Sequence, residues 1–417
     1  MRGLLAIPEL TARQWRVLLL VSSATFFDYY DITIISLALK QIQTDLLIRE
    51  ENLGLIGAVI QFGKIPAVFV ALAADRFGRR PVLLVTVIAY TILTGLSGLA
   101  PEAISFMLFQ FLARTFATAE LALAHVVIAE EVDKSHRGWA IGLMGTLAGF
   151  GSGLAYVLFG FIDQFPGGWR MLYFIGIAPL ILLIFLRRSL PETARFHRAV
   201  SGDEVKPDVS LAFRLQPLLY LVRRYPGRLL AVGAATFLFA YTQEPTYFFA
   251  PKFLQEEHGW KPHYIALLAP FGIITVFMSV AGGWMGDRFG RRRITIIFLI
   301  LTAGSALMLF QGSGFVALAV AMVGAGACSA VARINLFVYG AELFPTVSRA
   351  TAGGTLMVAN SLGGLTGLAL ESYLFRKTGS HALGLSILVA GLLPAVIALL
   401  FLPETSQRSL EEIAGEE

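Results

Sequence analysis

Long apolar stretches, separated by short polar segments, fill nearly all of the 417-residue chain. Several stretches contain no Asp, Glu, Lys or Arg for about 20 residues, the length that a helix needs to cross the roughly 30 Å hydrocarbon core of a bilayer. The longest, residues 294–332, is interrupted by Gly-Ser-Gly at 312–314 and therefore holds two helices. The pattern predicts twelve membrane-spanning helices, near residues 13–40, 52–74, 81–100, 104–132, 137–162, 169–188, 228–254, 262–286, 293–311, 315–343, 348–375 and 380–402.

One charged segment occurs twice. The sequence Asp-Arg-Phe-Gly-Arg-Arg ends at Arg80 and again, 212 residues later, at Arg292. Three further landmarks keep this offset: Glu130 with Glu342, Arg137 with Arg349, and Pro-Glu-Thr at 191–193 with Pro-Glu-Thr at 403–405. An internal repeat of this size is typical of a transporter built from two pseudo-symmetric halves.

The repeat and the helix pattern together predict the domain organisation. We expect a six-helix bundle at residues 1–188, a second six-helix bundle at 228–417, and a cytoplasmic linker at 189–227. Within the linker, the stretch from Leu211 to Tyr225 is amphipathic and carries basic residues. It predicts a helix that lies on the inner leaflet, with a disordered tether as the alternative.

Composition supports a membrane protein. Hydrophobic residues make up 56% of the chain and charged residues only 15%, too few to cover a soluble globule. Most of the 33 basic residues face the cytoplasm if both termini lie there, as the positive-inside rule requires. We therefore expect a multi-pass protein of the cell's inner membrane with cytoplasmic termini and no removable signal peptide. The formal net charge of +5 reflects these loops rather than nucleic-acid binding.

These motifs together resemble the major facilitator superfamily, close to its sugar-porter and metabolite:proton symporter branches. The resemblance rests on the repeated charged segment, on Arg114, on Glu130 followed by Arg137 and Gly138, and on the two Pro-Glu-Thr triplets. It implies alternating access and a central role for Arg114 in coupling.

Two stretches bear on the branch. Residues 26–31, Phe-Phe-Asp-Tyr-Tyr-Asp, are similar to the Asp-x-aromatic-Asp pattern of aromatic-acid:proton symporters, although a Gly commonly stands where Tyr29 does. The paired glutamines of sugar porters are missing from the seventh predicted helix, where residues 241–244 read Tyr-Thr-Gln-Glu.

The repeated charges predict a latch on the cytoplasmic side of each half. An Asp at the end of one helix can accept hydrogen bonds from the N-terminus of a facing helix, while the following arginines pair with a Glu at the end of another. The alternative is that these arginines only obey the positive-inside rule. The two expected latches are Asp75, Arg79, Glu130 and Arg137, and Asp287, Arg291, Glu342 and Arg349.

Ionisable groups inside the predicted spans are candidates for proton coupling. A charge at mid-membrane costs about 3 kcal/mol, so it should face a cavity, have a partner and perform a task. Asp28 and Asp31 lie three residues apart, on one face of the first helix. Two carboxylates this close in a low dielectric do not both carry a charge comfortably, which makes the pair a candidate proton carrier. Permanent pairing with a base of another helix is the alternative; Glu120 and Glu244 are further candidates.

Arg333 is the candidate ligand for a substrate carboxylate. By the 212-residue offset it corresponds to Leu121, next to Glu120, so we expect Arg333 and Glu120 to approach across a central cavity. Arg333 would bind substrate when Glu120 is protonated or displaced, whereas a purely structural bridge between them is the alternative. Further candidate substrate ligands are Arg114, Gln243, Tyr247, Asn335, Tyr339, Asn360 and Tyr29. No partner follows from the sequence for Lys64 or Glu371, and no role for His125.

The predicted function is a proton-coupled symporter of a small organic anion such as a carboxylate or an aromatic acid. The membrane potential opposes anion entry, and an accompanying proton removes that barrier. Alternatives are a sugar or polyol carrier, an organic-cation carrier and, from a different class, a nutrient sensor that binds without transport. No catalytic motif stands at a meaningful position, so we expect no enzyme, cofactor or metal. The expected partners are the substrate, protons and lipid, with a monomeric chain.

Overall fold

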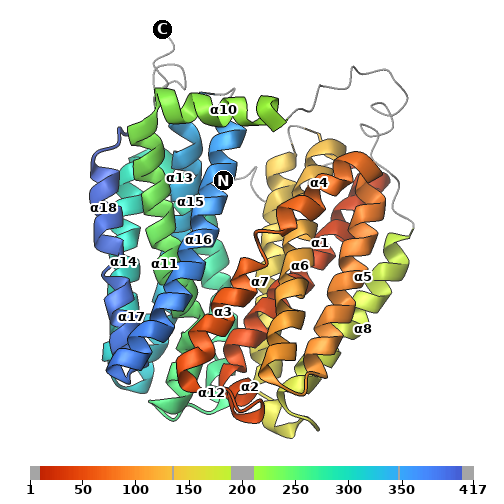
Figure 1. Ribbon diagram of the computed structural model, residues 1–417, viewed down its shortest axis with the longest axis vertical. Helices are drawn as coiled ribbons and strands as arrows, with labels where there is room; N and C mark the ends of the chain where they lie inside the picture. Colours follow the sequence, from red (N-terminus) through yellow and green to blue (C-terminus); the bar gives the residue numbers. More distant parts are fainter. Residues whose placement is uncertain (1–9, 134–135, 189–210, 346–347, 406–417) are drawn as a thin grey trace. The chain divides into compact units, whose positions relative to one another are not determined.

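The computed structural model describes residues 10–133, 136–188, 211–345 and 348–405, and all regular structure in these ranges is helical (Figure 1). Two compact units are formed. The first contains the described residues up to Gln41 and from Gly63 to residue 188, and the second contains Ile42–Phe62 and the described residues from 211 onward.

The described part of the first unit contains six long or medium helices and one short 3₁₀ turn. Its first helix begins at Thr11, whose side chain and backbone form a capping box with Gln14. The elements are α1 (Ala12–Leu37), α4 (Ala67–Phe77), α5 (Arg79–Gly98), α6 (Ala103–Glu131), α7 (Arg137–Phe159), η2 (Ile162–Gln164) and α8 (Trp169–Arg187). The short helix α2 (Leu39–Asp45) carries the chain from this unit into the second.

The second unit contains the remaining elements. They are η1 (Glu50–Asn52), α3 (Leu53–Phe62), α10 (Leu211–Arg224), α11 (Pro226–Glu256), α12 (Pro262–Ala266), η3 (Ala269–Phe271), α13 (Gly272–Phe289), α14 (Arg291–Gln311), α15 (Phe315–Glu342), α16 (Arg349–Thr378), α17 (His381–Val389) and α18 (Leu392–Leu400). Helix α10 coincides with the predicted amphipathic stretch and runs across the ends of the long helices of this unit (Figure 1). Its position on the inner leaflet stays a prediction.

Each of the twelve predicted spans corresponds to one helix or to successive short helices, which confirms the all-helical transporter fold. Three spans are interrupted: α3 and α4 are separated at Pro66, which lacks a backbone N–H, α13 is preceded by α12 and η3, and α17 is separated from α18. In the described ranges, ten spans are long and apolar enough to cross a membrane. The other two, α11 and α16, have polar residues in their middle.

The predicted division into bundles at 1–188 and 228–417 stays a prediction, because residues 189–210 of the linker lie outside the described residues. Within the described chain, Ile42–Phe62 belongs to the second unit, although in the sequence it lies between two segments of the first unit. Its helix α3 lies along α16 (Figure 1).

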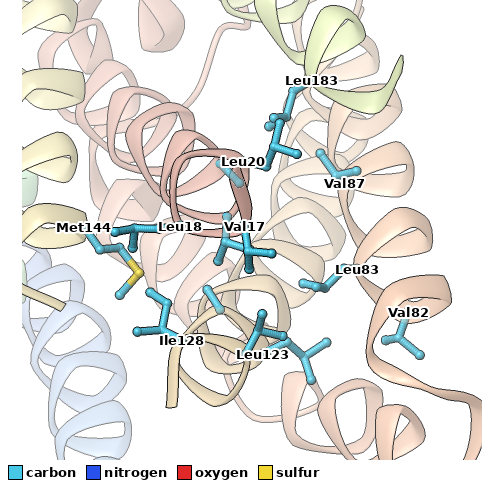
Figure 2. Close-up of a cluster of buried hydrophobic side chains, with 14 of the residues drawn as sticks. Val17, Leu18, Leu20, Val82, Leu83, Val87, Leu123, Ile128, Met144 and Leu183 are labelled. Atoms are coloured by element: carbon cyan, nitrogen blue, oxygen red, sulfur yellow. The ribbon is translucent and has the colours of Figure 1, made fainter. Parts of the chain in front are cut away.

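Buried side chains of α1, α5, α6, α7 and α8 form the core of the first unit. Figure 2 shows part of this cluster: Val17, Leu18, Leu20, Val82, Leu83, Val87, Leu123, Ile128, Met144 and Leu183. The second unit has its own core, drawn mainly from α11, α14, α15, α16 and α18. Between membrane helices such packing stabilises through van der Waals contacts rather than through removal of apolar surface from water.

Close contacts between paired helices repeat at the sequence offset. Helix α1 packs along α7, and a Cβ at Gly151 would overlap the backbone carbonyl of Phe26. Helix α11 packs along α16, where Gly363, 212 residues further on, approaches the carbonyl of Phe237 in the same way. The duplication seen in the sequence is therefore also a duplication of helix packing.

The glycine of the repeated charged segment has a conformational cause. Gly78 lies between α4 and α5 with φ of 97°, and Gly290 lies between α13 and α14 with φ of 106°. Side-chain-bearing residues rarely adopt such values, so only glycine turns the chain here without strain. After each turn the next helix begins at an arginine, Arg79 in α5 and Arg291 in α14.

Gly151→Ala should destabilise the first unit by about 1–3 kcal/mol, because the added methyl group overlaps the carbonyl of Phe26 and α1 must shift away from α7. Thermal unfolding of the purified protein measures this as a lower midpoint. Gly153→Ala, in the same helix with open space around its Cβ, is the matched control and should be neutral or slightly stabilising. Equal midpoints for the two variants would contradict the close approach.

Candidate substrate and proton sites

The predicted charge pairs form in both units. Arg79 Nη2 lies 3.2 Å from Glu130 Oε1 in the first unit, and Arg291 Nε lies 2.7 Å from Glu342 Oε1 in the second. The two arginines directly follow the two positive-φ glycines, and the two glutamates lie in the last turns of α6 and α15. The repeated motif thus joins the turn before one helix to the end of the helix that follows it.

The other latch residues make more local contacts. Arg291 also pairs with Asp287, one turn earlier in α13 and across the glycine. Arg137 Nε donates to the carbonyl of Val132 at 3.0 Å, and Arg349 Nε donates to that of Ala341 at 3.2 Å. Asp75 lies in α4, but its side chain is outside the described residues. The latch function of these groups stays a prediction.

The second Pro-Glu-Thr triplet has a role that the sequence did not reveal. Glu404 Oε1 accepts the backbone N–H of Arg292 at 3.1 Å, so this carboxylate caps the N-terminus of α14. Thr405 Oγ1 donates to Glu342 Oε2 at 2.7 Å. The triplet therefore links the Arg291–Glu342 pair to the N-terminus of α14. Its first copy, 191–193, lies outside the described residues.

The acidic pair of α1 lies buried beside Arg114. Asp28, Asp31 and Arg114 are 6%, 5% and 8% exposed, and Arg114 on α6 is close enough to act electrostatically on both carboxylates. Asp31 Oδ2 accepts a hydrogen bond from Thr94 at 3.3 Å, while Oδ1 is buried without a partner among the described residues. Lys64, at the break between α3 and α4, acts more weakly on Asp28. The predicted acidic pair and Arg114 are thus brought together.

Glu120 has a different partner from the one expected. Its carboxylate forms an ion pair with Arg187, the last residue of α8, and accepts a hydrogen bond from Thr86. Arg187 is fully buried and also donates to the carbonyls of Leu20 and Leu83, at 3.1 and 3.4 Å. This fully satisfied group favours a structural role for Glu120, so we leave it out of the proposed proton site.

Three of the predicted polar groups lie within about one turn of α11, at Gln243, Glu244 and Tyr247. Gln243 is buried, and neither of its side-chain polar atoms has a hydrogen-bond partner among the described residues. Glu244 Oε2 accepts from Gln61 Nε2 at 2.6 Å, and the Tyr247 hydroxyl lies 2.5 Å from that of Ser329 on α15. Gln243 retains its full hydrogen-bonding capacity for a bound molecule.

Arg333 and Asn360 have side chains that reach the surface of the second unit. Arg333 on α15 is exposed and lies near enough to Tyr247 to act on it electrostatically. Asn360 is half-buried on α16, and Tyr29 is half-buried on α1 of the first unit. These groups remain candidates for substrate binding.

Two predicted ligands are occupied in packing instead. Asn335 is fully buried and its Nδ2 donates to the carbonyl of Gly282 at 2.8 Å, which ties α15 to α13. Tyr339 is fully buried and its hydroxyl donates to the carbonyl of Pro403 at 2.5 Å. Because both groups serve helix contacts, we leave them out of the proposed substrate site. His125 bonds only the carbonyl of Leu121 in its own helix among the described residues.

The duplicated helices, the paired charges and the buried acidic pair define a multi-pass membrane transporter rather than an enzyme. The family model of the Major Facilitator Superfamily matches residues 21–284 and 267–417. The chain belongs to this superfamily, as its motifs predicted.

Relatives extend over nearly the whole chain. A candidate niacin/nicotinamide transporter of Bacillus subtilis (strain 168) is 26% identical over 400 residues, covering 92% of this chain and 95% of the relative. The benzoate transport protein of Acinetobacter baylyi is 24% identical over 405 residues, covering 89% of this chain and 86% of the relative. A solved structure of the xylose transporter of E. coli is similar with a TM-score of 0.77 at 18% identity, covering 96% of this chain and 99% of that one, which shows the fold.

Arg187→Met should cost about 3–5 kcal/mol of stability, because it leaves the buried carboxylate of Glu120 without its partner. Adding Glu120→Gln should recover a large part of this loss, since the double variant contains no orphan charge. Thermal unfolding of the four proteins of this double-mutant cycle measures the coupling. Strictly additive losses would contradict the ion pair.

Proposed function

We propose that this transporter is a proton-coupled symporter of a small organic anion, such as a carboxylate or an aromatic acid, that works by alternating access. The observation that carries the proposal is the buried group of Asp28, Asp31 and Arg114 in the first unit, where two carboxylates lie near one guanidinium. Such a group can take up or release a proton when the charges around it change.

Coupling follows from the competition for Arg114. A substrate anion bound to the guanidinium adds a negative charge to a site that already holds two carboxylates. In a low-dielectric interior this excess is costly, so Asp28 or Asp31 takes up a proton when substrate binds and returns it when substrate leaves. Substrate and proton then cross together, and the membrane potential no longer opposes entry of the anion.

The substrate class is supported by the relatives and by the second unit. Relatives of this chain carry the names of benzoate and niacin/nicotinamide transporters, and both benzoate and niacin are aromatic carboxylates. An exposed guanidinium such as Arg333 binds a carboxylate through two parallel hydrogen bonds. In the second unit, Gln243, Tyr247 and Asn360 are also proposed as substrate ligands, with Glu244 as a further carboxylate that can exchange a proton. In the first unit, Tyr29 is proposed as a substrate ligand.

The charge pairs of the repeated motifs are proposed to form the cytoplasmic gate. Arg79 with Glu130 and Arg291 with Glu342 connect helix ends within each unit, so their formation can depend on how those ends are arranged. Arg137, Arg349, Asp287 and Asp75 are proposed to support them. With this assignment the chain lies in the inner membrane as a monomer with both termini in the cytoplasm.

Asp31→Asn should abolish uptake driven by a pH gradient while substrate exchange across the membrane continues, because the amide cannot carry a proton. Reconstituted vesicles loaded with benzoate or nicotinate measure both activities. Asp28→Asn is expected to behave in the same way. Asp163→Asn, on the exposed η2 turn, is the control and should transport as the parent does. If both α1 variants accumulate substrate as the parent does, the proton carrier is another residue, and Glu244 is the next to test.

Arg333→Lys should weaken binding of a carboxylate substrate about tenfold, because an ammonium group cannot reproduce the paired hydrogen bonds of a guanidinium. Equilibrium binding or a thermal-shift titration with benzoate measures the affinity. Arg293→Lys, at the exposed start of α14, is the matched control. Parental affinity in Arg333→Lys would remove Arg333 from the substrate site.

A further inference from the structure

A histidine between two carboxylates lies in the second unit, apart from the acidic pair of α1. His381, the first residue of α17, has Nδ1 2.5 Å from Glu371 Oε1 and Nε2 2.6 Å from Glu50 Oε1. Glu371 belongs to α16 and is fully buried, and Glu50 belongs to η1. Both ring nitrogens are therefore engaged by carboxylate oxygens from two different parts of the chain.

The geometry requires two protons on these contacts. A neutral imidazole has one N–H group and one lone pair, so it can donate to only one of the two carboxylates. At the other nitrogen a lone pair would face a carboxylate oxygen, which is repulsive. The two short contacts coexist when His381 carries a proton on each nitrogen. Loss of one proton from the group breaks one contact.

The aromatic neighbours favour the same charged form. The imidazole of His381 stacks on Phe375 with ring centroids 4.2 Å apart and lies 4.8 Å from the ring of Phe249. A cation near the face of an aromatic ring is stabilised by the negative potential of that face. The stacking also fixes the orientation in which the two nitrogens point at Glu50 and Glu371.

With the other charged groups around the histidine, the net charge of the cluster depends on one proton. Lys252 on α11 is buried and pairs with Glu50 at 2.5 Å and with Glu256. Glu371 Oε2 is buried without a hydrogen-bond partner among the described residues. Helix α14, which packs against α17, carries no ionisable side chain from residue 294 to 311, and Gln43 of α2 donates to Glu50. Three carboxylates thus share two cationic groups, and an imidazole is the side chain whose ordinary pKa lies closest to neutral pH.

The cluster holds one segment of chain on the second unit. Glu50 immediately precedes α3, and the backbone N–H of Leu55 in α3 donates to Ser372 Oγ on α16 at 2.9 Å. A Cβ at Gly54 would lie 2.9 Å from Glu371 Oε2, so α3 and α16 are in close contact here. Beyond Phe62 the chain enters the first unit. The contacts of Glu50 therefore add to the packing of α3 that holds residues 42–62 on the second unit.

We propose that Glu50, Glu371, His381 and Lys252 form a second proton-binding site, which locks residues 42–62 onto the second unit when His381 carries both ring protons and releases them when one proton leaves. In the predicted topology this site lies on the outer side, where it is a gate that responds to external pH. The lock does not depend on which substrate is carried.

A cysteine beneath the segment reports its release. Ser372 is 1% exposed and covered by α3, so Ser372→Cys in a Cys328→Ala background reacts with a maleimide only when residues 42–62 leave. The purified protein in nanodiscs, without substrate, is labelled at several pH values. We expect labelling to be about tenfold slower at about pH 5.5 than at about pH 8.5, the range in which an imidazole loses its second proton.

Two variants separate the histidine from other titrating groups. His381→Phe keeps the aromatic stack but has no N–H, so labelling should be fast at every pH. Glu50→Gln removes the charge on the segment itself, at a side chain that is 29% exposed, and should give the same result even if His381→Phe does not fold. His263→Gln, in α12 of the same unit, is the control and should keep the parental pH dependence.

Labelling of the parent that does not change with pH would overturn the proposal. So would slow, parent-like labelling of Glu50→Gln at low pH, because the lock would then not depend on the carboxylate. The labelling result does not depend on the uptake tests of Asp28→Asn and Asp31→Asn, because no substrate or pH gradient is present in the labelling reaction.

Discussion

A charge removed from water into the interior of a membrane protein needs a partner, because the low dielectric makes an isolated charge cost several kcal/mol. Glu120 with Arg187, and Lys252 with Glu50 and Glu256, meet this requirement through direct ion pairs. Asp28 and Asp31 of α1 are both stabilised electrostatically by Arg114, but among the described residues neither forms a direct ion pair with it. That difference separates groups that hold the helices together from a group able to take up and release a proton.

The positions of the helices followed closely from the sequence, because lipid imposes one length and one polarity on every span. Helix α6, for example, was expected at 104–132 and extends from Ala103 to Glu131. Breaks within a span were harder to predict. The interruption between α3 and α4 lies in a span that the pattern predicted as one helix, and the assignment of Ile42–Phe62 to the second unit depends on contacts far apart in sequence.

The charge pairs were predictable where the sequence repeats itself and unpredictable where it does not. Arg79 with Glu130 and Arg291 with Glu342 could be matched in advance because the 212-residue offset marks both members of each pair. Arg187 and Lys252 lie near helix ends, where basic residues ordinarily flank a membrane span, and nothing in the sequence distinguishes a buried arginine there from an exposed one. The partners of Glu120 and Glu371 therefore emerged only when α8 and α17 were placed beside them.

The central claim is that the anion and a proton cross together. Its most direct measurement is the pH inside reconstituted vesicles, followed with an enclosed dye while benzoate is added outside at equal pH on both sides. Vesicles without protein correct for passive entry of the uncharged acid. The account predicts protein-dependent acidification of the interior that rises with substrate uptake. Substrate uptake with no protein-dependent change of internal pH would contradict it.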